Sequence, residues 1–441
     1  MDKIPLAVLP SLRRPLRPEC APDPLRDLLA AHIAATMVCF LDPDRISALA
    51  QDLRVVQRER VHDAGLVVCS LVLSAIARST DTQGRFLDAQ LTYRGLGGPD
   101  STPRSFRNMA RKLLPVLQEM LKRCLRKLAD MASHPVLRGR LERFADVIIP
   151  DGCAFKLANA LSGVYKGTGQ PAELKLHAVY SLRARSVTRV DASAGSVHDS
   201  DGFWPERWES GALYIWDLGY NCYERFIDAA EAGAIPLQRL KAGANPVVVA
   251  SYGKTGNRRE VRDEHGNHLR LNEACQFGYV HRQQVLDLDV IVEDDRHRTR
   301  QARLVCVPCN GEDRYYLTEL PHSIFTPYDV AELYRLRWEI ELFFRDWKGA
   351  HRLDEVRRLS NPTSLMLAVT ASLLAAALSN EIATGLEDIA AEYARQHAPA
   401  AFAAFPPCGA REAADREHRR SLIIAAATRR AQQRAGCERL G

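Results

Sequence analysis

The sequence predicts a mixed α/β protein with a helical N-terminal region, a split core and a β-rich insertion. Three observations support this fold class. Before about residue 140, apolar residues recur at spacings of three and four, which is typical of helices. Short apolar or alternating runs that favour strands follow at residues 147–149, 175–182 and 213–216. More strand-like runs fill residues 241–325 before helical spacing returns.

Length and composition narrow the class further. The 441 residues correspond to two to four domains, at about 100–200 residues per domain. A chain with 46% hydrophobic and 26% charged residues is not wholly disordered. The net charge of +6 permits a polyanionic partner without demonstrating one. Eleven cysteines are too few for a disulfide scaffold, and no secretory signal is visible, so we expect a soluble protein of a reducing cytoplasm.

A basic stretch marks the helical region. Glycines at residues 95–98 form a turn. Residues 104–127 then hold eight basic side chains and one acid, and Pro115 is expected to divide them into two helices. Helix, glycine turn and basic helix make the outline of a helix-turn-helix, for which a solvated basic face on a helical bundle is an equally good interpretation. The basic residues at the leading end are Arg104 and Arg107.

Two aspartates follow apolar strands in the expected core. Asp151 stands at a Pro-Asp-Gly break after residues 147–149, and Asp217 ends the run 213–216. A carboxylate beyond a strand end lies on a rim, where it can meet other acids. Asp-Gly is also ordinary turn chemistry, so neither aspartate identifies a site alone.

The most informative segment is expected to form one helix over residues 334–348. At about 100° per residue, Tyr334, Arg337, Glu341 and Lys348 share an arc of about 60° beside an apolar stripe that can dock on a sheet. An Arg–Glu pair four residues apart also decorates many surface helices. A carboxylate flanked by cations beside a buried stripe nevertheless suits metal and phosphate chemistry, because cations hold the polyanion and the acid holds the metal.

These motifs resemble those of a known family. The spacing Tyr-x2-Arg-x3-Glu-x6-Lys in residues 334–348 is similar to the signature of DDE transposases of the insertion-sequence-four group. Residues 151–155 resemble that family's first catalytic aspartate motif, and residues 217–220 resemble its second. The order Asp, Asp, β-rich insertion, Glu is also the family's. The resemblance covers roughly residues 145–380.

The resemblance implies a domain organisation. A ribonuclease-H-like core would comprise residues 141–240 and 326–380, interrupted by a β-rich insertion of residues 241–325. The all-α region 1–140 would bind DNA, and a helical C-terminal tail, 381–441, would pair two protomers. The implied partners are double-stranded DNA, as terminal inverted repeats and target, and a second copy of the chain in a synaptic complex. The implied compartment is the bacterial cytoplasm, at the nucleoid.

The resemblance also implies a reaction. Asp151, Asp217 and Glu341 would hold two Mg²⁺ ions, with Mn²⁺ able to substitute. One ion would activate a water that cuts the DNA at the element's end, and the freed 3′-hydroxyl would attack target DNA. The residues expected to bind DNA are Tyr334, Arg337 and Lys348 at the site and Arg104 and Arg107 on the helical domain. His198, in a His-Asp pair, would support the site.

Several questions stay open at this stage. Some members of the family that this chain resembles stack a flipped base on a tryptophan of the insertion, but no tryptophan lies between residues 218 and 337 here. Tyr252, Phe277 or Tyr279 could stack instead, so a hairpin route is undecided. Two other classes compete with a transposase. One is a metal-dependent DNA nuclease on the same core, and the other is a catalytically silent DNA-binding protein.

Two further signals favour ordinary structural interpretations. Cys306 and Cys309 form a lone CxxC in a strand-like stretch, and a structural zinc site needs four ligands. Residues 364–379 form an apolar helix shorter than the roughly 20 residues of a membrane span, so we expect a buried helix and no membrane partner.

Overall fold

The computed structural model describes a large part of the chain, within which two compact units are distinguished. The units are Met1–Glu387 and Asp388–Gly441, and every contact described below lies in the first. The N-terminal arm and most of the C-terminal tail lie outside the described residues. The described ranges are 24–56, 62–76, 84–131, 139–202, 205, 207–241, 243–253, 256–281, 284–309 and 312–397.

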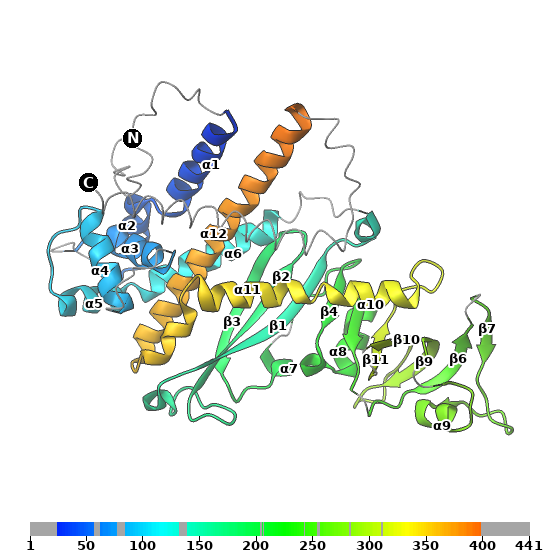
Figure 1. Cartoon of the computed structure of the whole chain (residues 1–441). Helices are drawn as coiled ribbons and strands as arrows, with labels where there is room; N and C mark the ends of the chain where they lie inside the picture. Colours follow the sequence, from blue (N-terminus) through cyan, green and yellow to red (C-terminus); the bar gives the residue numbers. More distant parts are fainter. Residues whose placement is uncertain are drawn as a thin grey trace, which may run out of the picture. The chain divides into compact units, whose positions relative to one another are not determined.

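Helices fill the N-terminal part of the chain (Figure 1). They are α1 (Pro24–Phe40), α2 (Pro43–Asp52), α3 (Ala64–Ile76), α4 (Arg85–Gly95), α5 (Pro103–Lys112) and α6 (Leu114–Met131). The predicted division of the basic stretch is confirmed, since helical structure stops at Leu113, two residues before Pro115. Thr102 caps α5 by accepting a hydrogen bond from the Ser105 N–H at 3.1 Å. These helices share a hydrophobic core with one side of α12 (Pro362–His397).

Within the described residues, the strands form an 11-stranded sheet with the order β3-β2-β1-β4-β5-β11-β10-β9-β6-β7, and β8 pairs with β6. Strands β1 to β3 are antiparallel, whereas β4 and β5 run parallel to β1. The strands are β1 (Val147–Lys156), β2 (Glu173–Ser181), β3 (Ser186–Ala194), β4 (Leu213–Trp216), β5 (Ile235–Arg239), β6 (Val247–Tyr252), β7 (Arg258–Glu260), β8 (Leu269–Arg270), β9 (Leu286–Glu293), β10 (Thr299–Cys309) and β11 (Glu312–Thr318).

The β-rich stretch predicted at residues 241–325 supplies strands β6 to β11. It continues the same sheet, because β11 pairs antiparallel with β5 over three residue pairs. A separate hydrophobic cluster fills this part of the sheet and includes α9 (Leu271–Gln276). The insertion is therefore joined to the first five strands by backbone hydrogen bonds as well as by the chain.

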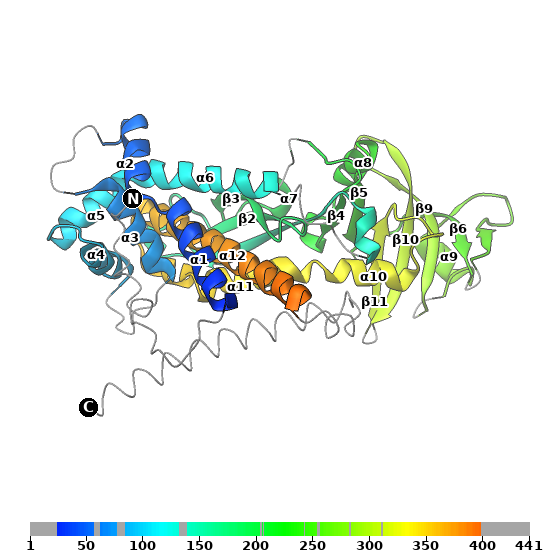
Figure 2. The same ribbon diagram turned by 90° about the horizontal axis from the view of Figure 1, so that it is seen from above.

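Alternation along β1 and β4 directs side chains to two different cores. Val147, Ile149 and Ile215 pack with residues of α11 (Trp338–Gly349). Ile148 and Tyr214 pack instead with residues of α8 (Tyr223–Glu231). Figure 2 shows α8 on the side of the sheet away from α10 (Pro327–Arg335) and α11. Odd-numbered positions of β1 and β4 thus face α11.

The structure corrects the expected end of the first strand. Pro150 was expected to break it, but β1 continues through Pro150 and Asp151 to Lys156. Its pairing with β4 stops at Ile148 and Tyr214, while its pairing with β2 goes on. Pro150 is tolerated because beyond Ile148 the strand has a free edge on the β4 side, where a missing N–H costs little. Asp151 therefore lies within a strand and beside an unpaired edge.

The structure also corrects the helix expected over residues 334–348. Helix α10 ends at Arg335, and α11 begins at Trp338. Leu336 and Arg337 keep helical dihedral angles, but their N–H groups bond three residues back, to Leu333 and Tyr334. This tighter turn changes the phase of the side chains. The two helices follow one another across the sheet (Figure 1).

Helix α12 contains the apolar stretch predicted to be buried. Its segment Pro362–Ile389 is long and apolar enough to cross a membrane, yet 78% of the apolar window is buried inside the protein. Leu365 and Leu373 face the core under α11, whereas Leu367 and Leu374 face the helical core. Burial between two cores accounts for the apolar composition, as predicted.

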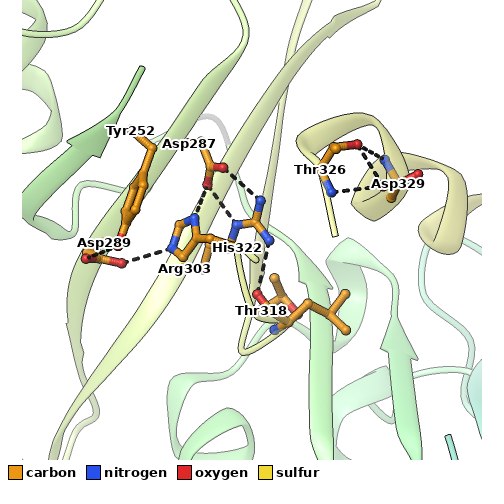
Figure 3. Close-up of polar contacts among 9 residues, drawn as sticks. Tyr252, Asp287, Asp289, Arg303, Thr318, His322, Thr326 and Asp329 are labelled. Atoms are coloured by element: carbon orange, nitrogen blue, oxygen red, sulfur yellow. Dashed lines mark hydrogen bonds and ion pairs between the residues drawn. The ribbon is translucent and has the colours of Figure 1, made fainter. Parts of the chain in front are cut away.

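A cluster of charged residues holds the segment that leads into α10 (Figure 3). His322 lies between two aspartates of β9, 3.0 Å from Asp287 Oδ1 and 3.1 Å from Asp289 Oδ1. Arg303 makes two hydrogen bonds to Asp287, at 2.7 and 2.8 Å, and donates another to the Leu320 carbonyl at 3.1 Å. The Tyr252 ring stacks on His322 with centroids 3.8 Å apart.

This cluster fixes where α10 begins. Burial acts to raise the pKa of Asp287, but the bonds from His322 and Arg303 outweigh it and hold the pKa below its ordinary value. Four residues beyond His322, Thr326 and Asp329 form a capping box at the N-terminus of α10 (Figure 3). The insertion thus positions the start of the helix pair that crosses the core.

Replacing Arg303 by Met should destabilise the protein. The substitution leaves the carboxylate of Asp287, whose side chain is 13% exposed, without its main partner. Breaking such a buried pair costs about 3–5 kcal/mol, so we expect a clear fall in the urea midpoint. Arg262→Met is the control, since Arg262 and Glu260 are 44% and 54% exposed and such pairs contribute about 0–1 kcal/mol. Equal midpoints for the two variants would contradict this role.

Candidate active site

Three carboxylates from different parts of the chain meet beside α11. Asp151 and Asp217 occupy odd-numbered positions that continue the α11-facing rows of β1 and β4. Asp217 directly follows β4 and has an extended backbone, as the N-cap of the short 3-10 helix Leu218–Tyr220. Glu341 stands in the first turn of α11. The predicted meeting of these acids is thus seen in the structure.

Arg337 lies between all three carboxylates. Its guanidinium is 3.3 Å from Asp151 Oδ2, 3.8 Å from Asp217 Oδ1 and 2.5 Å from Glu341 Oε1. The Arg337 side chain is 17% exposed. Burial acts to lower its pKa, but the surrounding acids and Tyr334 raise it, so the guanidinium is positively charged. One cation therefore faces three acids.

Tyr334 completes the group from the last turn of α10. Its hydroxyl donates a hydrogen bond to Asp217 Oδ1 at 2.9 Å. Burial and the nearby Asp217 raise the pKa of Tyr334, so the phenol keeps its proton and acts as a donor. The tight turn at Leu336 and Arg337 places Tyr334 against Asp217 and Arg337 among the three acids.

Asp151 is the acid most affected by burial. Desolvation raises its pKa to about 7, against the lowering effects of the Gly152 N–H and Arg337. Asp217 and Glu341 add to the increase, because a like charge disfavours ionisation. Burial is thus the main cause of the raised pKa of Asp151, and the two neighbouring acids contribute less.

The acids are held by the guanidinium, and they do not form a ready metal site. Among the described residues, no group of three or more His, Cys, Asp or Glu side chains is arranged to hold a metal ion. The donor set nevertheless suits a hard divalent cation, since it consists of carboxylate oxygens. The surplus negative charge around Arg337 is what such a cation would neutralise.

The other predicted residues lie away from this cluster. Lys348 is on α11, seven residues after Glu341, with its Nζ 5.3 Å from the centre of the Phe155 ring. Arg104 and Arg107 are exposed on α5. Arg107 lies over the Phe86 ring at 5.7 Å. His198 is exposed just before α7 (Asp199–Gly202).

The structure also places the aromatic residues considered for base stacking and the two cysteines of the CxxC motif. Tyr252 has one ring face covered by His322, whereas Phe277 and Tyr279 are 64% and 39% exposed. Cys306 and Cys309 are three residues apart on β10, so their side chains point to opposite faces of the strand. Such cysteines are poorly placed to share a metal ion.

The sequence pattern assigns no role to Trp338. This tryptophan directly follows Arg337 and is 58% exposed. Its position inside the Tyr-x2-Arg-x3-Glu-x6-Lys segment was a usable signal.

Comparisons with known proteins identify a family and relatives of the chain. A family model described as a transposase DDE domain matches residues 143–376. The transposase of insertion sequence element IS231F from Bacillus thuringiensis subsp. israelensis is 22% identical over 357 residues, which cover 72% of this chain and 73% of that protein. The transposase of insertion sequence element IS1151 from Clostridium perfringens is 32% identical over 257 residues, and the alignment covers 49% of this chain and 52% of that protein.

One solved structure also aligns over much of the chain. It is a piggyBac transposase synaptic complex with hairpin DNA, with a TM-score of 0.42 and 10% identity. The alignment covers 80% of this chain and 75% of that chain. A TM-score at this level is too low to establish a shared fold.

The raised pKa of Asp151 predicts a stability difference that depends on pH. Between about pH 4 and pH 7 the folded state holds a proton on Asp151 that the unfolded state has lost, so the stability of the wild type falls as pH rises through this range. Asp151→Asn removes the free-energy cost of keeping a buried carboxylate ionised in the folded state. That cost is at most about 4 kcal/mol, at about 1.4 kcal/mol per pKa unit. In EDTA, we expect the variant to melt above the wild type at pH 8 and with it near pH 4.

The control for this measurement is Asp191→Asn. Asp191 is on β3, is 48% exposed and pairs with Arg189, so its replacement should track the wild type at both pH values. An Asp151→Asn variant that is less stable than the wild type at pH 8 would show that the Arg337 contact outweighs desolvation.

Proposed function

The chain belongs to the transposase DDE domain family, and on this basis we propose that it is a DNA transposase that cuts DNA at the ends of an insertion sequence and joins the freed ends to a target. Its substrates would be duplex DNA carrying terminal inverted repeats and duplex target DNA. The similarity to transposases of insertion sequences over more than two thirds of the chain supports this proposal.

One observation carries the proposal. Carboxylates from β1, from the end of β4 and from α11 contact a single guanidinium, that of Arg337. These acids are 66 and 124 residues apart along the chain, at positions 151, 217 and 341. The three side chains are 16%, 37% and 30% exposed, and a fold that gathers three acids around one cation brings like charges close together, which favours a functional reason for the arrangement.

We further propose that Asp151, Asp217 and Glu341 are the catalytic acids and hold divalent metal ions, two Mg²⁺ in the simplest case. When bound, such ions activate the attacking oxygen and stabilise the leaving oxygen. The surplus of acids over cations and the all-oxygen donor set support this assignment. The Asp151 carboxyl, with a pKa of about 7, would release its proton as it accepts a cation.

The remaining side chains bind and orient the DNA. A guanidinium is planar and suits two oxygens of one phosphate, so Arg337 would turn from the acids to a phosphate of the cleaved strand. Tyr334 keeps Asp217 oriented through its hydroxyl. Lys348, which is exposed two turns further along α11, would bind a second phosphate. The exposed Trp338 offers a face on which an unpaired base could stack.

The reaction would have two steps, hydrolysis of one phosphodiester followed by transesterification of another. Water attacks the phosphorus at the element's end, a new P–O bond forms, and the 3′-oxygen leaves as a hydroxyl. That hydroxyl then attacks a target phosphodiester, and a target 3′-oxygen leaves in turn. Both steps need in-line geometry at one site, which a single cluster of acids under α10 and α11 can provide.

We propose a ribonuclease-H-like core for the first five strands together with α8, α10 and α11. The order β3-β2-β1-β4-β5, with three antiparallel strands followed by two parallel ones, supports this assignment. The helical region before residue 140 would hold the DNA ends through α5 and α6. Two copies of the chain would pair in a synaptic complex that holds both ends of the insertion sequence.

Replacing the acids should abolish chemistry and spare DNA binding. Loss of a residue that only supports a metal ligand costs about 10–100-fold in activity, so Asp151→Asn, Asp217→Asn and Glu341→Gln should each cost more than about 100-fold in cleavage and joining. The assay uses the chain with the DNA that flanks its gene and a target plasmid. Glu332→Gln, an exposed acid paired with Arg335 on α10, is the control.

This assay, together with the activity of the same variants in cells, separates the competing functions. Cleavage without any joined product would favour a nuclease. Activity in cells that survives all three substitutions would favour a catalytically silent DNA-binding protein.

The basic face of α5 predicts a specific salt dependence. If Arg104 and Arg107 each contact a phosphate, the double substitution to Ala should reduce the slope of log K against log salt by about 2. Arg45→Ala is the matched control, since Arg45 on α2 is 78% exposed and pairs with Asp42, the N-cap of that helix. An unchanged slope for the double variant would remove α5 from the DNA interface.

A further inference from the structure

A fourth aspartate lies on the opposite face of the sheet from Arg337. Asp199, at the start of α7, packs its carboxylate against the backbone that follows each strand acid. A methyl group built on Gly152 would stand 2.7 Å from Asp199 Oδ1, and one built on Gly219 would stand 3.1 Å from Asp199 Oδ2. Each oxygen of one carboxylate thus approaches a different glycine, one within β1 and one just after β4.

The two glycines are adjacent to the acids of the proposed site. Gly152 follows Asp151 directly, and Gly219 follows Asp217 by two residues. Gly152 is an even-numbered position of β1, so the side chain that it lacks would point away from α11. Neither glycine has a positive φ, so backbone strain does not explain the residue type, and the close approach of Asp199 does.

The sheet does not set the spacing of Asp151 and Asp217. The hydrogen-bonded register of β1 and β4 ends at Ile148 and Tyr214, three residues before each acid. Beyond that point the strands separate, and no ladder bond joins them within the described residues. Arg337 bridges the acids on the α11 face, and Asp199 fills the gap on the other face.

Asp199 is itself held in place. Lys175 on β2 lies 3.1 Å from Asp199 Oδ1 and donates a hydrogen bond to the Val197 carbonyl at 2.8 Å. The Lys175 side chain is 15% exposed, and that of Asp199 is 33% exposed. A buried neighbour, the hydroxyl of Tyr220, stands 3.4 Å from the position of a methyl group on Gly152 and has no hydrogen-bond partner in the described structure.

We propose that Asp199 is a positioning residue that sets the separation of Asp151 and Asp217 by wedging its carboxylate between Gly152 and Gly219. This inference rests on the proposed function, because the spacing matters only if the two aspartates bind metal together. If Arg337 were to leave the acids for a phosphate, as the proposed function has it, Asp199 would still restrain the two strand segments from the opposite face. The proposed role of Asp199 depends on the shape of its side chain between the two glycines more than on its negative charge.

Mn²⁺ binding to the full chain tests the proposal without any DNA. Titration followed by electron paramagnetic resonance should show about tenfold weaker binding for Asp199→Ala, the usual effect of losing a residue that supports metal ligands. Asp199→Asn keeps the shape and should stay within about threefold of the wild type. Asp191→Asn, an exposed acid on the neighbouring β3, should leave binding unchanged. Melting temperatures without metal should agree for all these variants.

A second variant covers the case in which Asp199→Ala does not fold. Gly152→Ala keeps the Asp199 side chain, but the added methyl group displaces the Asp199 carboxylate. This variant should weaken Mn²⁺ binding about tenfold. Combined with Asp199→Ala, the same substitution should add less than about twofold, since the close contact is already gone.

The outcomes are distinct. Wild-type affinity in Asp199→Ala, or an equal loss in Asp199→Asn, would overturn the wedge while leaving the metal site intact. A wild-type chain that binds no Mn²⁺ would overturn the proposed function and this inference together.

Discussion

The contact of one guanidinium with three carboxylates organises the centre of this protein. Arg337 reaches Asp151, Asp217 and Glu341 because β1 and β4 run side by side and α11 packs on the face that carries both aspartates. The tight turn between α10 and α11 is needed as well, because it places Tyr334 on Asp217 while Arg337 points among the acids. The sheet order, the positions of the two aspartates and the helix break thus all serve one constraint, which is that a guanidinium must offset the repulsion among three carboxylates.

The polar cluster of the insertion extends the same constraint outward. His322, Asp287 and Arg303 fix the segment before α10, and the capping box of Thr326 and Asp329 fixes its first turn. The position of Arg337 is therefore determined from both ends, by the insertion at the start of α10 and by the sheet beneath α11. An insertion that shares a sheet with the core can hold that start firmly, because β11 is bonded directly to β5.

Much of this could be predicted from the sequence, and the failures have physical causes. Alternation and apolar runs located the core strands, and the spacing of Tyr334, Arg337 and Glu341 identified the residues that meet. The continuation of β1 through Pro150 was missed because a proline at an unpaired edge costs little. The helix break at Leu336 was missed because neither residue of the turn is a helix breaker. The approach of Asp199 to two glycines depends on contacts between distant segments, which no local pattern records.

The two outer strands of the sheet carry a consequence for assembly. At one end, β7 is short and consists of Arg258, Arg259 and Glu260, all exposed. At the other end, β3 packs against α6. Charged, short or covered margins discourage strands of separate molecules from pairing and so protect against aggregation. Two copies that come together on DNA would therefore have to join through helical surfaces or through the nucleic acid, with each sheet remaining complete within its own molecule.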